Sequence, residues 1–245
     1  MLLCTTLVVN KLHAANIDEK EKTIKDVAQI YQASMVYIFA QQPTINDPNA
    51  DKQNLFGQKF IQSVETTYDR LFKQEFPDKN NPYVKRLLNI MTQVMERNRT
   101  LVTDKDITFK GLIPAIYAFQ ISEYSKARNL GLKIKFLNFK ERTRNEFNVP
   151  DLWETRALTK INEQRNLTVL DKNVRYKGVS AYRLMNPVTM KPMCLSCHGS
   201  QEHNPLNIGR PKNEWTNIDK TGFEMEGWQL SDLGGGISVV LYDIE

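Results

Sequence analysis

The sequence of 245 residues has few of the residues on which most catalytic sites depend, with only 3 cysteines and 3 histidines. Outside the N-terminal segment only His198 and His203 remain, so we expect no Ser-His-Asp arrangement. The stretch DLGGGISV (232–239) lacks the lysine and the strand-loop-helix order of a phosphate-binding loop. We therefore predict that the protein is not an enzyme, beyond what a bound cofactor itself supplies.

Blocks of like charge are also missing, although the formal net charge is +5. Lysine and arginine are spread along the chain with acidic residues between them, as in DEKEKTIKD (18–26). This mixture is typical of a solvated surface and predicts no nucleic-acid partner. Beyond the N-terminus, no segment is apolar enough over a sufficient length to cross a membrane.

The N-terminal residues MLLCTTLVV (1–9) form a short apolar run, and Ala14 and Ala15 follow it. This order is typical of a secretory signal, although the usual basic residues are missing. We predict a signal peptide over residues 1–15 and hence a periplasmic protein. A stray apolar N-terminus or a start codon assigned too late would give the same pattern. Cys4 does not resemble a lipid-anchored cysteine, because a leucine precedes it.

The first half of the chain is predicted to be helical. The predicted helices share apolar residues at every third or fourth position, and they span 18–41, 52–74, a segment from Pro82, and 114–129. A loop rich in Pro, Asn and Asp (43–51) separates the first two.

The second half alternates apolar and polar residues, as strands do. The predicted strands are 132–139, 167–171, 176–185 and 234–244, with a short helix over 151–164 that Asp151 would cap. We expect an α+β fold, with an antiparallel sheet flanked by helices and preceded by a helical N-terminal segment. The predicted domains are the helical segment (16–109) and the sheet domain (110–245).

Two cysteines and a histidine stand together in MCLSCHG (193–199). Haem c is attached by adding two cysteine sulfurs across the porphyrin vinyl groups, and two intervening residues let both thiols reach. The next imidazole then ligates the iron. We predict one covalent haem c, with Cys194 and Cys197 as anchors and His198 as the iron ligand. Gly199 would let the chain turn away beside the ring.

A CxxC pair alone could also be a redox dithiol or half of a zinc site. A redox motif usually opens a helix next to a strand. A zinc site needs four ligands, and the further candidates are Cys4, His13 and His203. The first two fall in the predicted signal peptide, so zinc would lack a ligand. A non-haem thiol protein is kept as an alternative.

The residues around the motif resemble a known family. RTRNEFNVPDLWE (142–154), CLSCHG (194–199) and DKTGFEMEGWQLSDLGGGISV (219–239) follow one another as in the bacterial single-haem c domain with a PAS-like fold. This family occurs as free periplasmic proteins and as the sensing part of chemoreceptors and sensor kinases. The resemblance covers roughly residues 110–245. It implies a five-stranded antiparallel sheet with helices packed on it and haem against one face.

The resemblance also concerns the sixth ligand of the iron. Some family members supply a cysteine from the helix before the Arg-Asn segment, and Phe119 stands at that position here. Phenylalanine cannot ligate iron, so we expect an open distal site walled by Phe119, Tyr117 and Ile116. An open ferrous site would bind a diatomic gas. Methionine is the other option, although core packing is the commoner role of each candidate: Met35, Met91, Met95, Met185 and Met190.

Arginines near the Arg-Asn segment are candidate partners for the haem propionates. Guanidinium binds carboxylates bidentately, so Arg142 and Arg144 are predicted to contact the cofactor, together with Asn145. A solvated loop is the alternative. Gly222 and Gly227 are predicted to serve turns.

Together these features predict an exported monohaem c-type protein that senses redox state or a diatomic gas. The signal would pass to an unknown redox or signalling partner protein. A small periplasmic electron-transfer cytochrome is the alternative. The N-terminal helices could form a homodimer surface.

Overall fold

The computed structural model describes residues 3–127 and 130–243, with side chains from Glu19 onward. It divides into two compact units, each made from more than one segment of the chain. The helical unit contains Met1–Phe136, Leu170–Met185 and Ile237–Glu245, and the motif unit contains Leu137–Val169 and Asn186–Gly236. The predicted domain boundary between residues 109 and 110 stays a prediction, as does the signal peptide over residues 1–15, whose side chains lie outside the described part.

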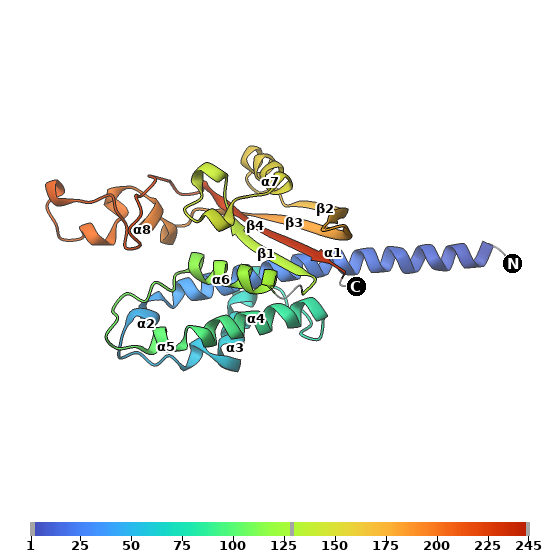
Figure 1. Cartoon of the computed structure of the whole chain (residues 1–245), viewed down its shortest axis with the longest axis horizontal. Coiled ribbons are helices and arrows are strands. Elements are labelled where there is room, and N and C mark those ends of the chain that lie inside the picture. Colours follow the sequence, from blue (N-terminus) through green and yellow to red (C-terminus); the bar gives the residue numbers. More distant parts are fainter. Residues whose placement is uncertain (1–2, 128–129, 244–245) are drawn as a thin grey trace. The chain divides into compact units, whose positions relative to one another are not determined.

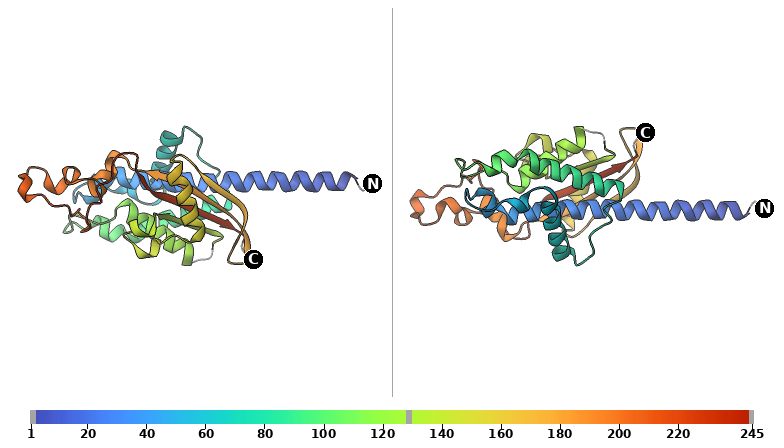
Figure 2. Two further views of the ribbon diagram at one scale, coloured as in Figure 1. Left: turned by 90° about the horizontal axis from the view of Figure 1, so that it is seen from above. Right: turned by 90° about the horizontal axis from the view of Figure 1, so that it is seen from below.

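Four helices pack together in the helical unit (Figures 1 and 2). They are α1 (Leu3–Ala40), α3 (Gly57–Phe72), α4 (Pro82–Arg97) and α6 (Pro114–Ala127). Apolar residues on their facing sides are fully buried, among them Ile24, Phe60, Leu87 and Ile121. The four predicted helices are therefore confirmed, and their periodicity reflects a shared core.

Local chemistry sets where several helices begin. The Asn81 side chain accepts hydrogen bonds from the backbone N–H groups of Tyr83 and Val84, and Pro82 fits the first turn of α4. In α7 (Leu152–Glu163) the Asp151 side chain accepts from the N–H of Glu154, whose own side chain accepts from the N–H of Asp151. The predicted cap at Asp151 is thus confirmed as a capping box.

Two boundary predictions are wrong. The predicted loop over 43–51 contains a short helix, α2 (Gln42–Asn46), because Pro43 fits a first helical turn. The predicted helix over 52–74 is divided into the 3₁₀ turn η1 (Gln53–Leu55) and α3, since Phe56 is extended and Gly57 has φ of +56°. Another short helix, α5 (Arg99–Thr103), follows α4.

The sheet in the described residues has four antiparallel strands in the order β1-β4-β3-β2. They are β1 (Leu132–Leu137), β2 (Val169–Tyr176), β3 (Val179–Thr189) and β4 (Leu233–Tyr242). The α+β fold class is confirmed, whereas the family resemblance implied five strands. The last strand in the chain is an inner strand, and all ten of its residues are buried.

Besides α7, the motif unit consists mainly of short turns. Two 3₁₀ turns of three residues precede α7: η2 (Lys140–Arg142) and η3 (Glu146–Asn148). The long segment between β3 and β4 contains one short α-helix, α8 (Leu195–His198), among its described residues, and four more 3₁₀ turns of three residues: η4 (Pro192–Cys194), η5 (Gln201–His203), η6 (Pro205–Asn207) and η7 (Lys212–Glu214).

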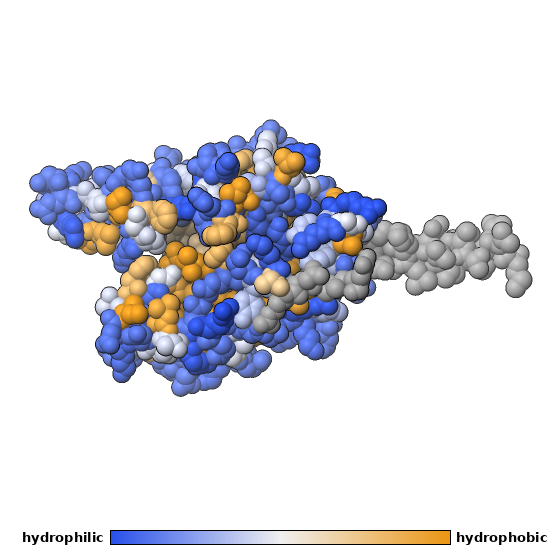
Figure 3. Space-filling model, viewed as in Figure 1, coloured by the Kyte–Doolittle hydropathy of each residue, from blue (hydrophilic) through white to orange (hydrophobic). Residues whose placement is uncertain are grey.

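Most of the surface is hydrophilic, as expected from charged residues that are spread along the whole sequence. In the view of Figure 3, hydrophilic residues cover most of the face shown and hydrophobic residues gather in a few patches. Among the described residues, no helix combines the length and the apolar character that a membrane span requires.

Candidate functional site

The CxxCH motif forms a single compact helical segment in the motif unit. Turn η4 runs directly into α8, and Cys194, at the junction, has helical angles (φ −72°, ψ −27°). Residues three apart lie on the same side of a helical turn, so the thiols of Cys194 and Cys197 are neighbours. Both are free and only partly buried. Two accessible thiols thus share one side of one turn.

The two thiols of the motif have different surroundings. The Sγ atom of Cys194 accepts a hydrogen bond of 3.5 Å from the backbone N–H of Lys191. Burial raises the pKa of the Cys197 thiol above its ordinary value. In a redox dithiol the attacking cysteine needs a lowered pKa, which provides the reactive thiolate. Cys197 itself does not meet this requirement.

The imidazole of His198 is held by a carboxylate. Its Nδ1 atom lies 2.8 Å from Oε2 of Glu226. Burial alone raises the pKa of Glu226, but the hydrogen bonds from His198 and Arg144 outweigh it, and this pKa is lowered. An ionised carboxylate only accepts hydrogen bonds, so Nδ1 is the donor. In the neutral ring the lone pair is then on Nε2, so Nε2 is the nitrogen that can ligate a metal.

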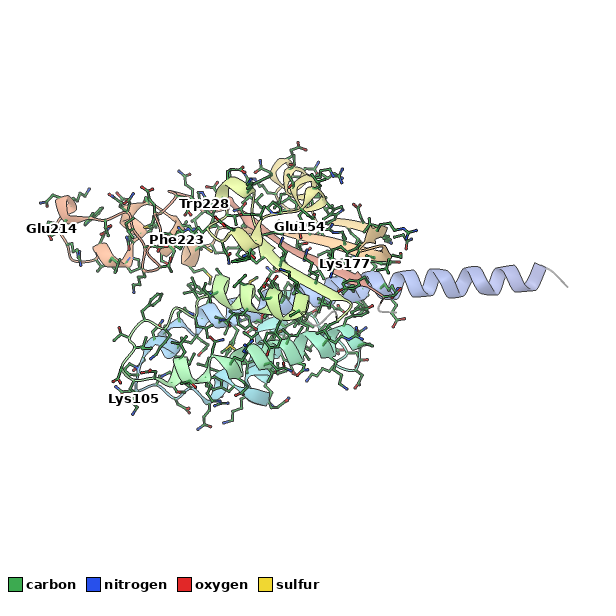
Figure 4. All side chains as sticks on the ribbon, in the orientation of Figure 1. Lys105, Glu154, Lys177, Glu214, Phe223 and Trp228 are labelled. Atoms are coloured by element: carbon green, nitrogen blue, oxygen red, sulfur yellow. The ribbon has the colours of Figure 1, made fainter. Side chains whose placement is uncertain are left out.

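One face of the same ring is covered by an indole. Trp228 stacks on His198 with ring centroids 5.1 Å apart and an interplanar angle of 13°. Backbone bonds fix the pair, since Trp228 N–H donates to His198 O (2.8 Å) and Gly227 N–H donates to Gly199 O (3.1 Å). Arg142 lies over Trp228, 6.0 Å from the ring centroid. Figure 4 labels Trp228 and Phe223 in this part of the motif unit.

Arg144 ties three segments of the motif unit together. Its Nε and Nη2 atoms donate to the two carboxylate oxygens of Glu226, at 2.7 and 2.9 Å. Its Nη1 donates to Asp219 (2.7 Å), and Nη2 also donates to the backbone oxygens of Cys197 and Glu224. The guanidinium is therefore an organising group at the centre of the motif unit. Its predicted contact with a propionate stays a prediction.

Asp219 is the buried end of this network. Its side chain has 0% exposure, and its Oδ1 accepts from the N–H and hydroxyl of Thr221. Burial alone raises its pKa, but the hydrogen bonds from Thr221 and Arg144 outweigh that effect and lower it. A buried carboxylate with this many donors is ionised at neutral pH and holds Arg144 in place.

Gly199 is needed for its lack of a side chain. A Cβ atom here would lie 2.7 Å from Leu195 O and 2.9 Å from Nδ1 of His203. Its φ is −82°, so space and not backbone conformation is the constraint. The prediction for Gly222 is confirmed, because its φ is 85° and its N–H donates to Asp219 O across a turn. Gly227 also has positive φ (73°), but its N–H donates to the distant Gly199 O and it does not lie in a turn.

His203 has a structural role. Its Nδ1 accepts from the backbone N–H of Ser200 (3.3 Å) and lies 3.0 Å from the Ser200 hydroxyl. The Nδ1 lone pair accepts these hydrogen bonds, so the neutral ring carries its proton on Nε2. Within the described residues, no three His, Cys, Asp or Glu side chains gather as a metal site would require.

The remaining predicted site residues lie as follows. Asn145 accepts from Phe147 N–H at 3.0 Å and begins η3. Phe119 belongs to the helical unit and lines a groove of about 810 Å³ between α4 and α6, with Arg97 and Tyr124. Tyr117 is fully buried and packs against Phe60 of α3, so its contacts are those of a core residue, and its predicted place on the wall of an open site stays a prediction.

The methionine candidates all lie in the core. Their exposures are 8% or less: Met35, Met91, Met95, Met185 and Met190. Gly234 makes room for one of them, because a Cβ there would lie 2.4 Å from Cε of Met190. Their burial therefore favours a role in core packing over ligation of the iron.

Sequence reasoning missed Glu226, the residue that contacts the motif histidine. Glu226 is 28 residues from His198 and has no regular spacing to it. The only signal was that EMEGWQ lies in a segment that resembles the family.

The fold and site define an α+β protein with a one-turn CxxCH helix. The chain belongs to the Tll0287-like family, whose model matches residues 15–241. Among solved structures, it is similar to the crystal structure of the cyanobacterial heme-protein Tll0287, with 16% identity and a TM-score of 0.40. That match covers 68% of this chain and 98% of the other. No curated protein matches.

Proposed function

We propose that this protein binds one haem c through thioether bonds from Cys194 and Cys197, with His198 as an axial ligand of the iron. The observation that carries this proposal is the donor set of one helical turn. It combines two free thiols on one side with an imidazole whose Nδ1–H is already held by Glu226. Membership of the family of Tll0287, a cyanobacterial heme-protein, supports it.

The residues present fit such a group. Bound haem would supply one-electron redox chemistry and a site for diatomic ligands. The protein's part is to keep the Nε2 lone pair of His198 available, through Glu226. Trp228 covers one face of the imidazole and restricts its rotation. Arg142, Arg144 and Asn145 are proposed to contact the propionate carboxylates of the haem.

The proposed role is sensing of redox state or of a diatomic gas, passed to a partner protein after export to the periplasm. A simple electron-transfer role is the alternative. In neither role is the protein an enzyme. The apolar N-terminal run supports export. A homodimer through the N-terminal helices is a further part of this proposal.

Haem attachment is tested by producing the full chain together with the haem c maturation machinery. We expect intact mass to rise by one haem, and an absorbance spectrum of haem c after alkaline pyridine treatment. Cys194→Ser and Cys197→Ser should each leave one thioether, and the double variant none. His203→Gln is the matched control and should load normally. If the wild-type protein showed only the mass of the polypeptide, covalent haem attachment would be contradicted. The non-haem thiol protein would then be the remaining alternative.

Carbon monoxide separates the two roles. If the reduced protein has an open site, its absorbance bands shift when the gas is added. An unchanged spectrum with a methionine-type near-infrared band would favour electron transfer.

A further inference from the structure

Glu226 joins His198 to Arg144 through one carboxylate. Its Oε2 atom accepts from His198 Nδ1 (2.8 Å) and from Arg144 Nη2 (2.9 Å), while Oε1 accepts from Arg144 Nε (2.7 Å). The Glu226 side chain is 25% exposed, so the three groups are shielded from most of the solvent. These three hydrogen bonds thus fix the position of the carboxylate.

The hydrogen bond to Nδ1 has a consequence for the other nitrogen of the ring. A donor bond to a carboxylate fixes the tautomer and raises the basicity of Nε2, as is general for metal-ligating histidines. Arg144 acts in the opposite direction. It neutralises part of the Glu226 charge, so the proton stays on the imidazole and is not transferred to the carboxylate.

Arg144 is held from its other side by Asp219, whose side chain is completely buried. Arg144 also donates to the backbone oxygen of Cys197, next to His198. Arg144 therefore links Glu226 to the CxxCH turn. A shift of Glu226 would disturb the hydrogen bonds that Arg144 makes to both.

We propose that Glu226 is a positioning residue that fixes His198 in the Nδ1–H tautomer and lowers the reduction potential of a metal centre bound at Nε2. The part about potential rests on the proposed haem function. The part about the tautomer does not, because it concerns the protein's own residues.

The tautomer is tested without haem, by ¹⁵N NMR of the imidazole nitrogens in the apo protein at about pH 9, where ordinary histidine is neutral. The chain has 3 histidines, so His203→Gln assigns the signals of the mature protein, and His13→Gln completes the assignment when residues 1–15 are kept. We expect His198 in the Nδ1–H form. In Glu226→Ala the Nε2–H form should become the major one. A wild type already in the Nε2–H form would overturn the proposal.

The potential is tested in the haem-loaded protein by spectroelectrochemical titration. Glu226→Gln is close to isosteric, removes the charge and leaves one acceptor oxygen in place of two. We expect the equilibrium constant for reduction to rise about tenfold, which for one electron is about 59 mV. Glu226→Asp should recover part of the shift. Should Glu226→Ala not fold, these two variants still decide the outcome.

The control is Glu224→Gln, which removes the same charge two residues away. The Glu224 side chain bonds Asn217 and not the imidazole. Equal shifts in the Glu224 and Glu226 variants would show a general charge effect and overturn the proposal. Failure of haem to attach would count against the proposed function, whereas the apo tautomer would still decide the role of Glu226.

Discussion

The orientation of the His198 imidazole depends on side chains from two other parts of the sequence, one at residue 144 and one at residues 226–228. Glu226 accepts a hydrogen bond from Nδ1 of the ring, Trp228 stacks on one face of the ring, and Arg144 holds Glu226 in place. Arg144 is a cation held between two carboxylates, with its own side chain 21% exposed. When one partner of a buried ion pair is removed, the other remains desolvated without compensation, and this costs more than a surface pair contributes.

We expect Arg144→Ala to lower the free energy of unfolding by about 3 kcal/mol, because it leaves the buried Asp219 carboxylate without its cation. Arg144→Lys should lose about half as much, since an ammonium cannot bond both carboxylates in the same fork. Urea unfolding of the apo protein measures both values.

Arg142→Ala is the control for Arg144. It removes the same charge from an arginine that lies over Trp228, and it should cost less than about 1 kcal/mol. Similar losses for the two alanine variants would contradict a specific role for Arg144.

The motif itself could be predicted from sequence because its members are neighbours in the chain. Cys194, Cys197 and His198 need only one helical turn to come together. Arg144 lies 53 residues from Cys197 and 82 from Glu226, and its contacts depend on how the long segment between β3 and β4 folds back. The sequence therefore indicated a carboxylate-binding role for Arg144, but not that its partners are Glu226 and Asp219.

The turn that carries the motif is short, and its end is sterically restricted. Helix α8 has four residues, and the N–H of Gly199 donates to Leu195 O at its end. The backbone then continues into η5, where Ser200 and His203 cap each other. No side chain fits between these two turns at position 199.

Gly199→Ala should destabilise the apo protein by about 2 kcal/mol, as overpacking against backbone atoms does. Haem attachment should fall with it, because the His198 turn must shift. Gly222→Ala is the matched comparison. A Cβ atom at Gly222 would have no neighbour within 4 Å, but φ there is +85°, so its cost of about 1 kcal/mol comes from conformation alone. Thermal unfolding compares them, and equal haem loading in both variants would contradict the steric explanation.

The elements that were predicted well have local signals, and those predicted poorly do not. Asn81, Pro82 and Asp151 mark helix starts by their chemistry. Strand β2 extends to Tyr176, beyond its predicted end at residue 171. Three polar residues in a row, 171–173, interrupt the alternation, although Val174 and Tyr176 beyond them pack against the core. A break in the pattern on an edge strand therefore looks like the end of the strand.

In the helical unit, α1 and the strands are distant in sequence but joined by ionic contacts. Lys20 bonds Asp243 at 2.9 Å, across 223 residues, and Glu21 pairs with Lys172 in β2. Each predicted domain was one continuous segment, whereas this unit collects three segments of the chain. Contacts at such sequence separations depend on the completed fold and leave no periodic signal.

Glu21 gives these long-range contacts a measurable dependence on pH. Hydrogen bonds from Lys172 and Lys25 lower its pKa from 4.5 to about 2. A carboxyl whose pKa is lower in the folded state stabilises the fold above its unfolded pKa, and this contribution is lost as the pH falls toward the folded value. We expect Glu21→Gln to cost about 0.5–1 kcal/mol at pH 7, a size set by its partly exposed position.

The difference between wild type and Glu21→Gln should shrink between about pH 5 and pH 2 and vanish below that. Urea midpoints at several pH values measure it. Glu19→Gln, at an exposed position two residues away, is the control and should show no such window. If the stability difference between wild type and Glu21→Gln did not change with pH, protonating Glu21 would cost nothing. Glu21 would then stabilise the fold through packing and not through its pairs with Lys172 and Lys25.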